Sequence, residues 1–221
     1  MDSEQISRHF GSVDMNWSAS QFLGLDRYFR ANLLNSATGF KSISLLGSKS
    51  LDGITNLAVF SQIIHLGADP ALIGILFRPQ VAGMHSLKNI REANIFTLNH
   101  IVEGEDLKAH WTSARWENSE FEAVGFEEEF VEGISAPFVK GSRVRMALRP
   151  EQELPIAMNG TTLLISSVQY LEVPYSSLLE DGFIDLGKAG SLAGSGLDGY
   201  VKTTGLMRYS YAKPEIKPNL I

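Results

Sequence analysis

The sequence contains no cysteine among its 221 residues. This absence excludes disulfides, thiolate-bound zinc, iron–sulfur clusters and a cysteine nucleophile. Any redox chemistry must therefore depend on a bound cofactor. Histidine is scarce, and no two histidines have the i, i+4 spacing of a helical metal pair, so we expect isolated polar positions and no metal site. The five histidines are His9, His65, His85, His100 and His110.

Long apolar runs and clusters of positive charge are also missing. No apolar run approaches the roughly 20 residues that span a bilayer, and the first residues lack the basic and apolar regions of a signal peptide. We therefore expect a cytoplasmic protein without a membrane partner. The formal net charge is −6, with no basic stripe, which disfavours nucleic acid as a partner. Acidic residues gather between Glu120 and Glu132, a pattern typical of a solvated face or loop.

Two motifs of well-known enzyme classes are absent or incomplete. No G-x-S-x-G occurs, so nothing supports a hydrolase nucleophile. Residues 194–199 fit G-x-G-x-x-G, but a dinucleotide fingerprint must follow a strand, open a helix and precede an acidic residue by about 20 positions. The preceding residues 186–193 look loop-like, and only 22 residues follow, two of them proline. We interpret this segment as a flexible loop or a close backbone approach.

The hydrophobic pattern predicts many short strands and few long helices. An amphipathic helix is predicted over residues 18–36, and Thr38-Gly39 ends it. This composition favours a mainly β class, a β-barrel with helical excursions. The glycine-rich last forty residues predict an extended tail. Strands are predicted at 40–49, 54–60, 72–77, 95–101, 142–148 and 161–173, a short helix at 86–93, and polar helix or loop at 105–129.

One strand has the pattern of a surface for a planar ligand. After a tight turn at residues 50–53, the side chains of Asn56, Ala58 and Phe60 point to the same face. A small residue between hydrogen-bonding neighbours lets a flat ring lie close to the backbone. By spacing alone, however, an ordinary half-buried strand fits this pattern better.

A second group of residues has the chemistry of an anion site. Arg78 directly follows an apolar strand, and His85-Ser86 begins a predicted helix. An arginine, a hydroxyl and a helix N-terminus are the groups that a phosphate monoester needs. Each residue singly fits a surface charge or a helix cap. Together they predict a phosphate-binding site.

A series of short motifs extends from Arg30 almost to the C-terminus. They are Arg30 to Ser36, Gly39 to Lys41, Gly53 to Ser61, His65 to Pro70, Ile73 to Pro79, His85 to Ile90 and Phe96 to His100, with weaker ones at Ser113 to Arg115, Ala136-Pro137 and Gly196 to Ala212. In combination they resemble the flavin reductase-like FMN-binding split-barrel family, and are most similar to its flavoredoxin-like branch. The resemblance implies a six-stranded Greek-key barrel that forms a homodimer, with FMN at the subunit interface.

The resemblance also implies a set of cofactor-binding residues. The hairpin from Ser50 to Thr55 would face the isoalloxazine ring, and the following strand would line the ribityl chain and phosphate. Ser86 stands where the family often has threonine, and it keeps the hydroxyl. We treat residues 1–221 as a single domain, with an N-terminal helical segment (1–38) and a C-terminal tail (190–221). The implied residues are Ser50, Thr55, Asn56, Ala58, Ser61, Arg78, His85, Ser86 and Asn89.

The implied activity is that of an NAD(P)H-dependent flavin reductase. Hydride transfer to a flavin needs no side-chain acid or base, so no catalytic residue is named. Some branches carry a C-terminal histidine at the nicotinamide site, and this chain has none after His110. Three alternatives therefore stay open: an electron carrier reduced by a partner protein, a non-catalytic flavin-binding module and, more distantly, a pyridoxamine phosphate oxidase-like enzyme.

Overall fold

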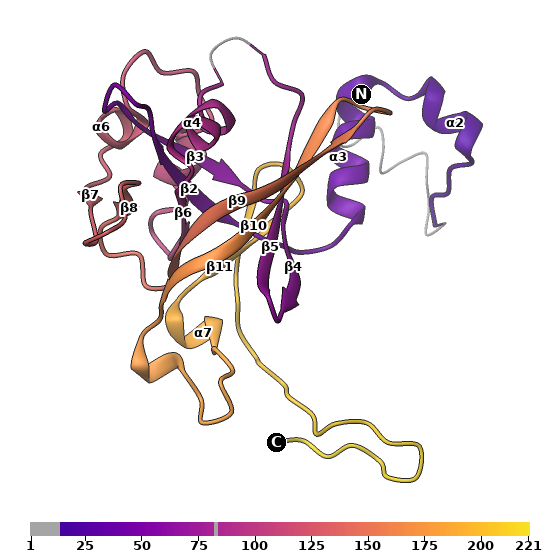
Figure 1. Ribbon diagram of the computed structural model, residues 1–221. Helices are drawn as coiled ribbons and strands as arrows, with labels where there is room; N and C mark the ends of the chain where they lie inside the picture. Colours follow the sequence, from indigo (N-terminus) through magenta and orange to yellow (C-terminus); the bar gives the residue numbers. More distant parts are fainter. Residues whose placement is uncertain (1–13, 82–83) are drawn as a thin grey trace.

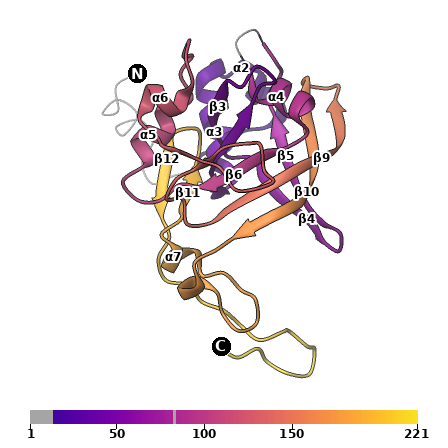
Figure 2. The ribbon, with the colours of Figure 1, turned by 60° about the vertical axis from the view of Figure 1, so that its left-hand side comes forward.

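The computed structural model describes residues 14–81 and 84–221. His9 and the first 13 residues of the expected N-terminal helical segment lie outside this range. The described residues form a strongly twisted antiparallel barrel with short helices around it (Figure 1, Figure 2).

The main sheet has seven strands in the order β3-β2-β6-β9-β10-β5-β4, and every neighbouring pair is antiparallel. This architecture confirms the mainly β class and the helical excursions, with one strand more than the six expected. The strands are β2 (Ser44–Lys49), β3 (Thr55–Phe60), β4 (Ile63–Ala68), β5 (Ala71–Phe77), β6 (Phe96–His100), β9 (Arg145–Ile156) and β10 (Thr161–Glu172).

Two smaller sheets complete the β structure. The first is β1-β11-β12, and β1 continues almost directly into β2 of the main sheet. The Ser42 hydroxyl donates to the Ile63 carbonyl at 2.7 Å, so the chain before β2 meets the opposite end strand and the sheet curls toward closure. The small sheets contain β1 (Lys41–Ser42), β11 (Leu192–Ser195) and β12 (Gly199–Lys202), and β7 (Glu128–Glu129) and β8 (Phe138–Val139).

Two short helices replace the single N-terminal helix that the sequence predicts. Leu25 is extended, and the Asp26 carboxylate accepts from the N–H groups of Tyr28 and Phe29, so a new helix begins there. The helices are α2 (Ala19–Gly24), α3 (Arg27–Ala37), α4 (Ser86–Ala93), α5 (Asp106–Trp111), α6 (Glu120–Val124) and α7 (Leu186–Ala189), with a 3₁₀ turn η1 (Tyr175–Ser177).

Two hydrophobic cores lie on opposite faces of β2 and β3. Because side chains alternate along a strand, Leu46 joins the core beneath α4, whereas its neighbour Leu45 joins the core beneath α5 and α6. Leu57 on β3 belongs to the second core and is fully buried. The strand pair β2–β3 is therefore shared by both cores.

Three segments differ from their sequence-based predictions. Strand β4 was missed because Gly67 interrupts its pattern, and a bulge at the preceding residue, Leu66, leaves the pairing with β5 irregular. Strand β9 extends through Pro150 to Ile156, since a register shift beside Pro150 accommodates the missing N–H. Residues 194–199 contain the turn of the β11–β12 hairpin at 196–198, while Gly194, Ser195 and Gly199 belong to its strands, so the expected loop is confined to three residues. The close backbone approach is confirmed, because a Cβ at Gly199 would lie 2.7 Å from the Ser195 carbonyl oxygen.

The two ends of the described chain expose apolar side chains. The structure describes every residue of helices α2 and α3, and none of these residues is buried. Leu23, for example, is 81% exposed. We call residues 204–221 the C-terminal arm, which leaves the barrel as an extended hairpin (Figure 1). Arg208 anchors it through Asp181 at 2.5 Å and the ring of Phe183. Among residues 14–81 and 84–221, no helix has the length and apolar character needed to cross a membrane.

Candidate functional site

The start of helix α4 and strand β3 are joined by buried polar side chains. The Asn56 amide donates to the Ser86 hydroxyl at 3.0 Å. One turn further along α4, the Asn89 amide donates to the Ser48 hydroxyl of β2 at 3.3 Å. All four residues are less than one-tenth exposed. The structure therefore brings together three of the predicted cofactor-binding residues, Asn56, Ser86 and Asn89.

Helix α4 begins without a side-chain cap. His85 occupies the cap position, is exposed and accepts no hydrogen bond from the first turn. The first backbone N–H groups of a helix have no partner within the helix, and the helix dipole makes this end positive. The Ser86 hydroxyl accepts from Asn56 and keeps its own proton to donate. This donor set fits a phosphate group.

Arg78 directly follows β5 and is exposed. Within the described residues no carboxylate lies at ion-pair distance from its guanidinium, and no hydrogen bond joins it to Ser86 or His85. Burial lowers the pKa of Lys41, and the positive charge of Arg78 lowers it further. The charges of Lys41 and Arg78 are therefore close enough to interact.

The remaining predicted residues are placed differently. The Ser50 hydroxyl accepts from Ile54 N–H at 3.1 Å and closes the turn before β3. The Thr55 hydroxyl donates to the Glu128 carboxylate at 2.5 Å and also contacts Ser119. The Thr55 hydroxyl has thus already donated its proton, whereas the Ser50 hydroxyl only accepts and keeps its proton to donate. Ala58 lies in β3 and Ser61 directly follows the strand, and both are half-buried.

The sequence did not reveal that the segment before β7 binds the outer edge of β3. The Glu120 carboxylate accepts from Leu57 N–H at 2.9 Å, and the Thr112 hydroxyl accepts from Val59 N–H at 3.1 Å. The solvated-face interpretation of the acidic residues is therefore wrong for Glu120, which is partly buried. The other bonded carboxylates remain accessible to solvent, as expected, although they also contact Lys140, Thr55 and Arg145; they are Glu127, Glu128 and Glu129.

One histidine is partly buried and electrically neutral. Burial lowers the pKa of His100 to about 4. Its Nδ1 lies 3.0 Å from the hydroxyl oxygen of Ser191, which is itself 3% exposed. This serine–histidine pair joins β6 to the segment before β11.

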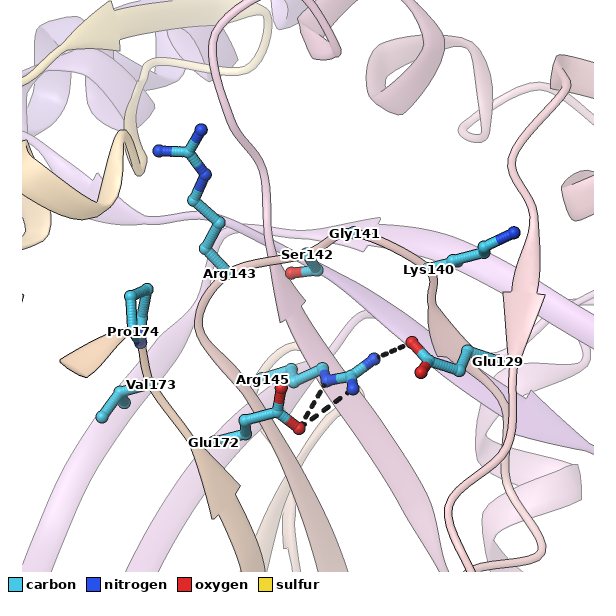
Figure 3. A pocket seen from close by; sticks show the side chains of 9 residues that line it. All are labelled: Glu129, Lys140, Gly141, Ser142, Arg143, Arg145, Glu172, Val173 and Pro174. Atoms are coloured by element: carbon cyan, nitrogen blue, oxygen red, sulfur yellow. Dashed lines mark hydrogen bonds and ion pairs between the residues drawn. The ribbon is translucent and has the colours of Figure 1, made fainter. Parts of the chain in front are cut away.

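A cavity of about 490 Å³ lies away from these residues, between β7, β9 and β10 (Figure 3). The buried Arg145 guanidinium lies between the carboxylates of Glu129 and Glu172 and over the ring of Phe138. Burial by itself would lower the pKa of Arg145, but the two carboxylates outweigh this effect, so the pKa of Arg145 is raised. The Tyr170 hydroxyl and then Arg145 lower the pKa of Glu172. None of the predicted cofactor-binding residues lines this cavity, and Arg145, one of its two arginines, is already paired with carboxylates.

Comparison with known proteins gives a consistent family. Residues 41–181 match the flavin reductase like domain family. A candidate flavin reductase with a split barrel domain from Shewanella frigidimarina is 38% identical, with a TM-score of 0.86 over 90% of this chain and 100% of that chain. An uncharacterized protein of Halalkalibacterium halodurans is 31% identical over 88% of this chain and 96% of its own length. Flavoredoxin of Desulfovibrio vulgaris (Miyazaki F), 18% identical, shares the fold, with a TM-score of 0.65 over 79% of this chain and 91% of that chain.

Proposed function

Because the chain belongs to the flavin reductase like domain family, we propose that it is an FMN-binding oxidoreductase that is reduced by NADH or NADPH and acts in the cytoplasm. The observation that carries this proposal is the buried Asn56–Ser86 contact beside an uncapped helix start. That arrangement offers hydrogen-bond donors to a phosphate. It unites residues from β3 and α4 that are 30 positions apart in the chain.

Each element of the site has a distinct role in the proposal. Bound FMN would supply the hydride acceptor and pass electrons to a further acceptor. The start of α4, with His85, Ser86 and Arg78, would hold the phosphate by charge and by hydrogen bonds. Asn89 would fix the position of α4 through Ser48. The residues that would line the rest of FMN are Ser50, Thr55, Asn56, Ala58 and Ser61.

The purified protein is expected to bind FMN and to oxidise NADH or NADPH when FMN is present. Absorption bands of bound flavin, followed by steady-state turnover with each nucleotide, test the two parts separately. Flavin binding without turnover by either nucleotide would contradict the reductase and favour an electron carrier reduced by a partner protein. No flavin binding at all would overturn the cofactor assignment itself.

We also propose that the chain, as a single domain over residues 1–221, works as a homodimer. Helices α2 and α3 and the C-terminal arm expose large apolar side chains, with Tyr28 at 76% and Tyr211 at 87%. Large exposed apolar patches on a soluble protein are typical of protein–protein interfaces. An isologous contact between two copies would cover the same surfaces on each subunit.

Light scattering at micromolar concentration is expected to show a dimer, with a total interface above about 1,200 Å². Removal of residues 204–221 is expected to weaken that dimer, because the exposed apolar side chains of the arm are lost. The replacement Tyr175→Ser, at an exposed tyrosine outside both surfaces, is the matched control. A monomeric full-length protein would contradict the prediction.

A further inference from the structure

Strand β3 is an end strand of the main sheet, so its outward N–H groups have no neighbouring strand. Two of them donate to side chains instead. Leu57 N–H donates to the Glu120 carboxylate at 2.9 Å, and Val59 N–H donates to the Thr112 hydroxyl at 3.1 Å. Thr112 is only 3% exposed and donates in turn to the Ala109 carbonyl at 2.7 Å, which fixes its orientation.

The two bonded N–H groups belong to particular peptide units. The N–H of Leu57 lies in the peptide that joins it to Asn56, and the N–H of Val59 lies in the peptide that joins it to Ala58. These are the peptides that immediately follow two of the predicted FMN-contacting residues. A side chain that holds either peptide plane therefore sets the direction in which Asn56 or Ala58 faces the cofactor.

We propose that Glu120 and Thr112 are positioning residues that fix the flavin-facing side of β3 from its outer edge without touching the flavin. This inference rests on the proposed function. The two hydrogen bonds hold the β3 backbone to α5 and α6, while Asn56 holds the opposite face of the strand to α4. The Thr55 hydroxyl adds a third contact between β3 and the chain around α6, through Ser119 before this helix and Glu128 after it.

The surroundings of Glu120 favour such a role. Burial raises its pKa, and the Leu57 N–H bond partly opposes that rise, so the carboxylate accepts this bond in a partly dry environment. Hydrogen bonds count for more where water is excluded. On the inner side of this edge, Leu57 is fully buried in the core beneath α5 and α6, so β3 has little freedom to shift unless the contacts to these helices change.

The test compares pairs of variants that differ only in the acceptor. Glu120→Ala and Thr112→Val remove the acceptor, whereas Glu120→Gln and Thr112→Ser keep one. Glu122→Ala, at an exposed position two residues further on α6, is the matched control. Three quantities are measured for each protein: amide hydrogen exchange of Leu57 and Val59 without flavin, the Kd for FMN, and the urea midpoint of unfolding.

Loss of either acceptor is expected to reduce protection of the amide it served and to raise the Kd for FMN by about tenfold, the size of one lost hydrogen bond to a charged or buried group. The variants that keep an acceptor should restore both values. Unchanged FMN affinity in folded Glu120→Ala and Thr112→Val would overturn the inference and leave the contacts as protection of a strand edge. If the wild-type protein binds no FMN, the proposed function fails as well. If the wild-type protein binds FMN and the variants bind it equally well, only the positioning role is overturned.

Discussion

Replacement of Arg78 by alanine is expected to weaken FMN binding by about thirtyfold or more while leaving riboflavin binding nearly unchanged. Only FMN carries the phosphate, and losing the charged partner of a desolvated anion costs on the order of 2–5 kcal/mol. Arg78 is exposed in the protein without ligand and has no carboxylate partner within the described residues, so its removal leaves no charge of the protein unpaired. The loss should therefore appear in binding and not in folding.

Fluorescence titration of each variant with FMN and with riboflavin measures this difference. Arg78→Lys should give an intermediate affinity, because lysine keeps the charge and loses the bidentate fork. Arg91→Ala serves as the control, since Arg91 is bound to Glu153 on the surface of α4 and β9. If Arg78→Ala weakened both ligands equally, Arg78 would not contact the phosphate.

Replacement of Arg145 by alanine is expected to have the largest effect on stability, about 3 kcal/mol, the lower end for a broken buried ion pair. The guanidinium is 8% exposed, whereas its partners Glu129 and Glu172 are 41% and 43% exposed, so water can solvate the abandoned carboxylates in part. The replacement also removes the contact with the Phe138 ring and the connection between β7, β9 and β10.

Urea unfolding near pH 7 measures the loss, and Arg149→Ala is the matched control. Arg149 lies on the same strand and pairs with Glu151 at 3.0 Å, but both are exposed, so its loss should cost less than about 1 kcal/mol. A penalty for Arg145→Ala no larger than that for Arg149→Ala would show that the cluster does not hold the three strands together.

The same cluster predicts a pH dependence. Tyr170 and Arg145 lower the pKa of Glu172 in the folded protein, so the unfolded chain binds a proton at higher pH than the folded one. The stabilisation of the folded state is therefore fully present at pH values above the ordinary pKa of glutamate. It is lost as the pH falls from that value through the lowered pKa of Glu172 in the folded protein. Removal of Arg145 should reduce this part of the acid sensitivity.

Local signals predicted those parts of the site that lie close together in the sequence. Helix α4 was predicted at its observed bounds because His85-Ser86 marks its start and its apolar residues have a helical period. The alternating pattern after the turn at residues 50–53 likewise placed Asn56 on one face of β3. These inferences needed only neighbouring residues, which is why they agree with the structure.

The rest depended on contacts between distant residues. Glu120 and Leu57 are 63 positions apart, and nothing in an acidic run distinguishes a carboxylate that binds a strand edge from one that faces water. The contact between Asn56 and Ser86 also joins separate elements, so the sequence could name both residues without showing that they touch. Strand β9 was cut short because proline normally ends a strand, whereas its bulge is set by pairing with β10.

The strand pair shared by the two cores divides the evolutionary constraints on this chain. Alternate residues of one strand pack in different cores, as Leu45 and Leu46 do, so the residues that limit substitution at one position differ from those at the next. Substitutions beneath α5 and α6 can therefore drift together, provided that an acceptor remains at positions 112 and 120, without altering the side chains on the α4 face. A lineage could in this way remodel the whole 105–129 segment, and with it the surroundings of the strand edge, while inheriting the residues around α4 unchanged.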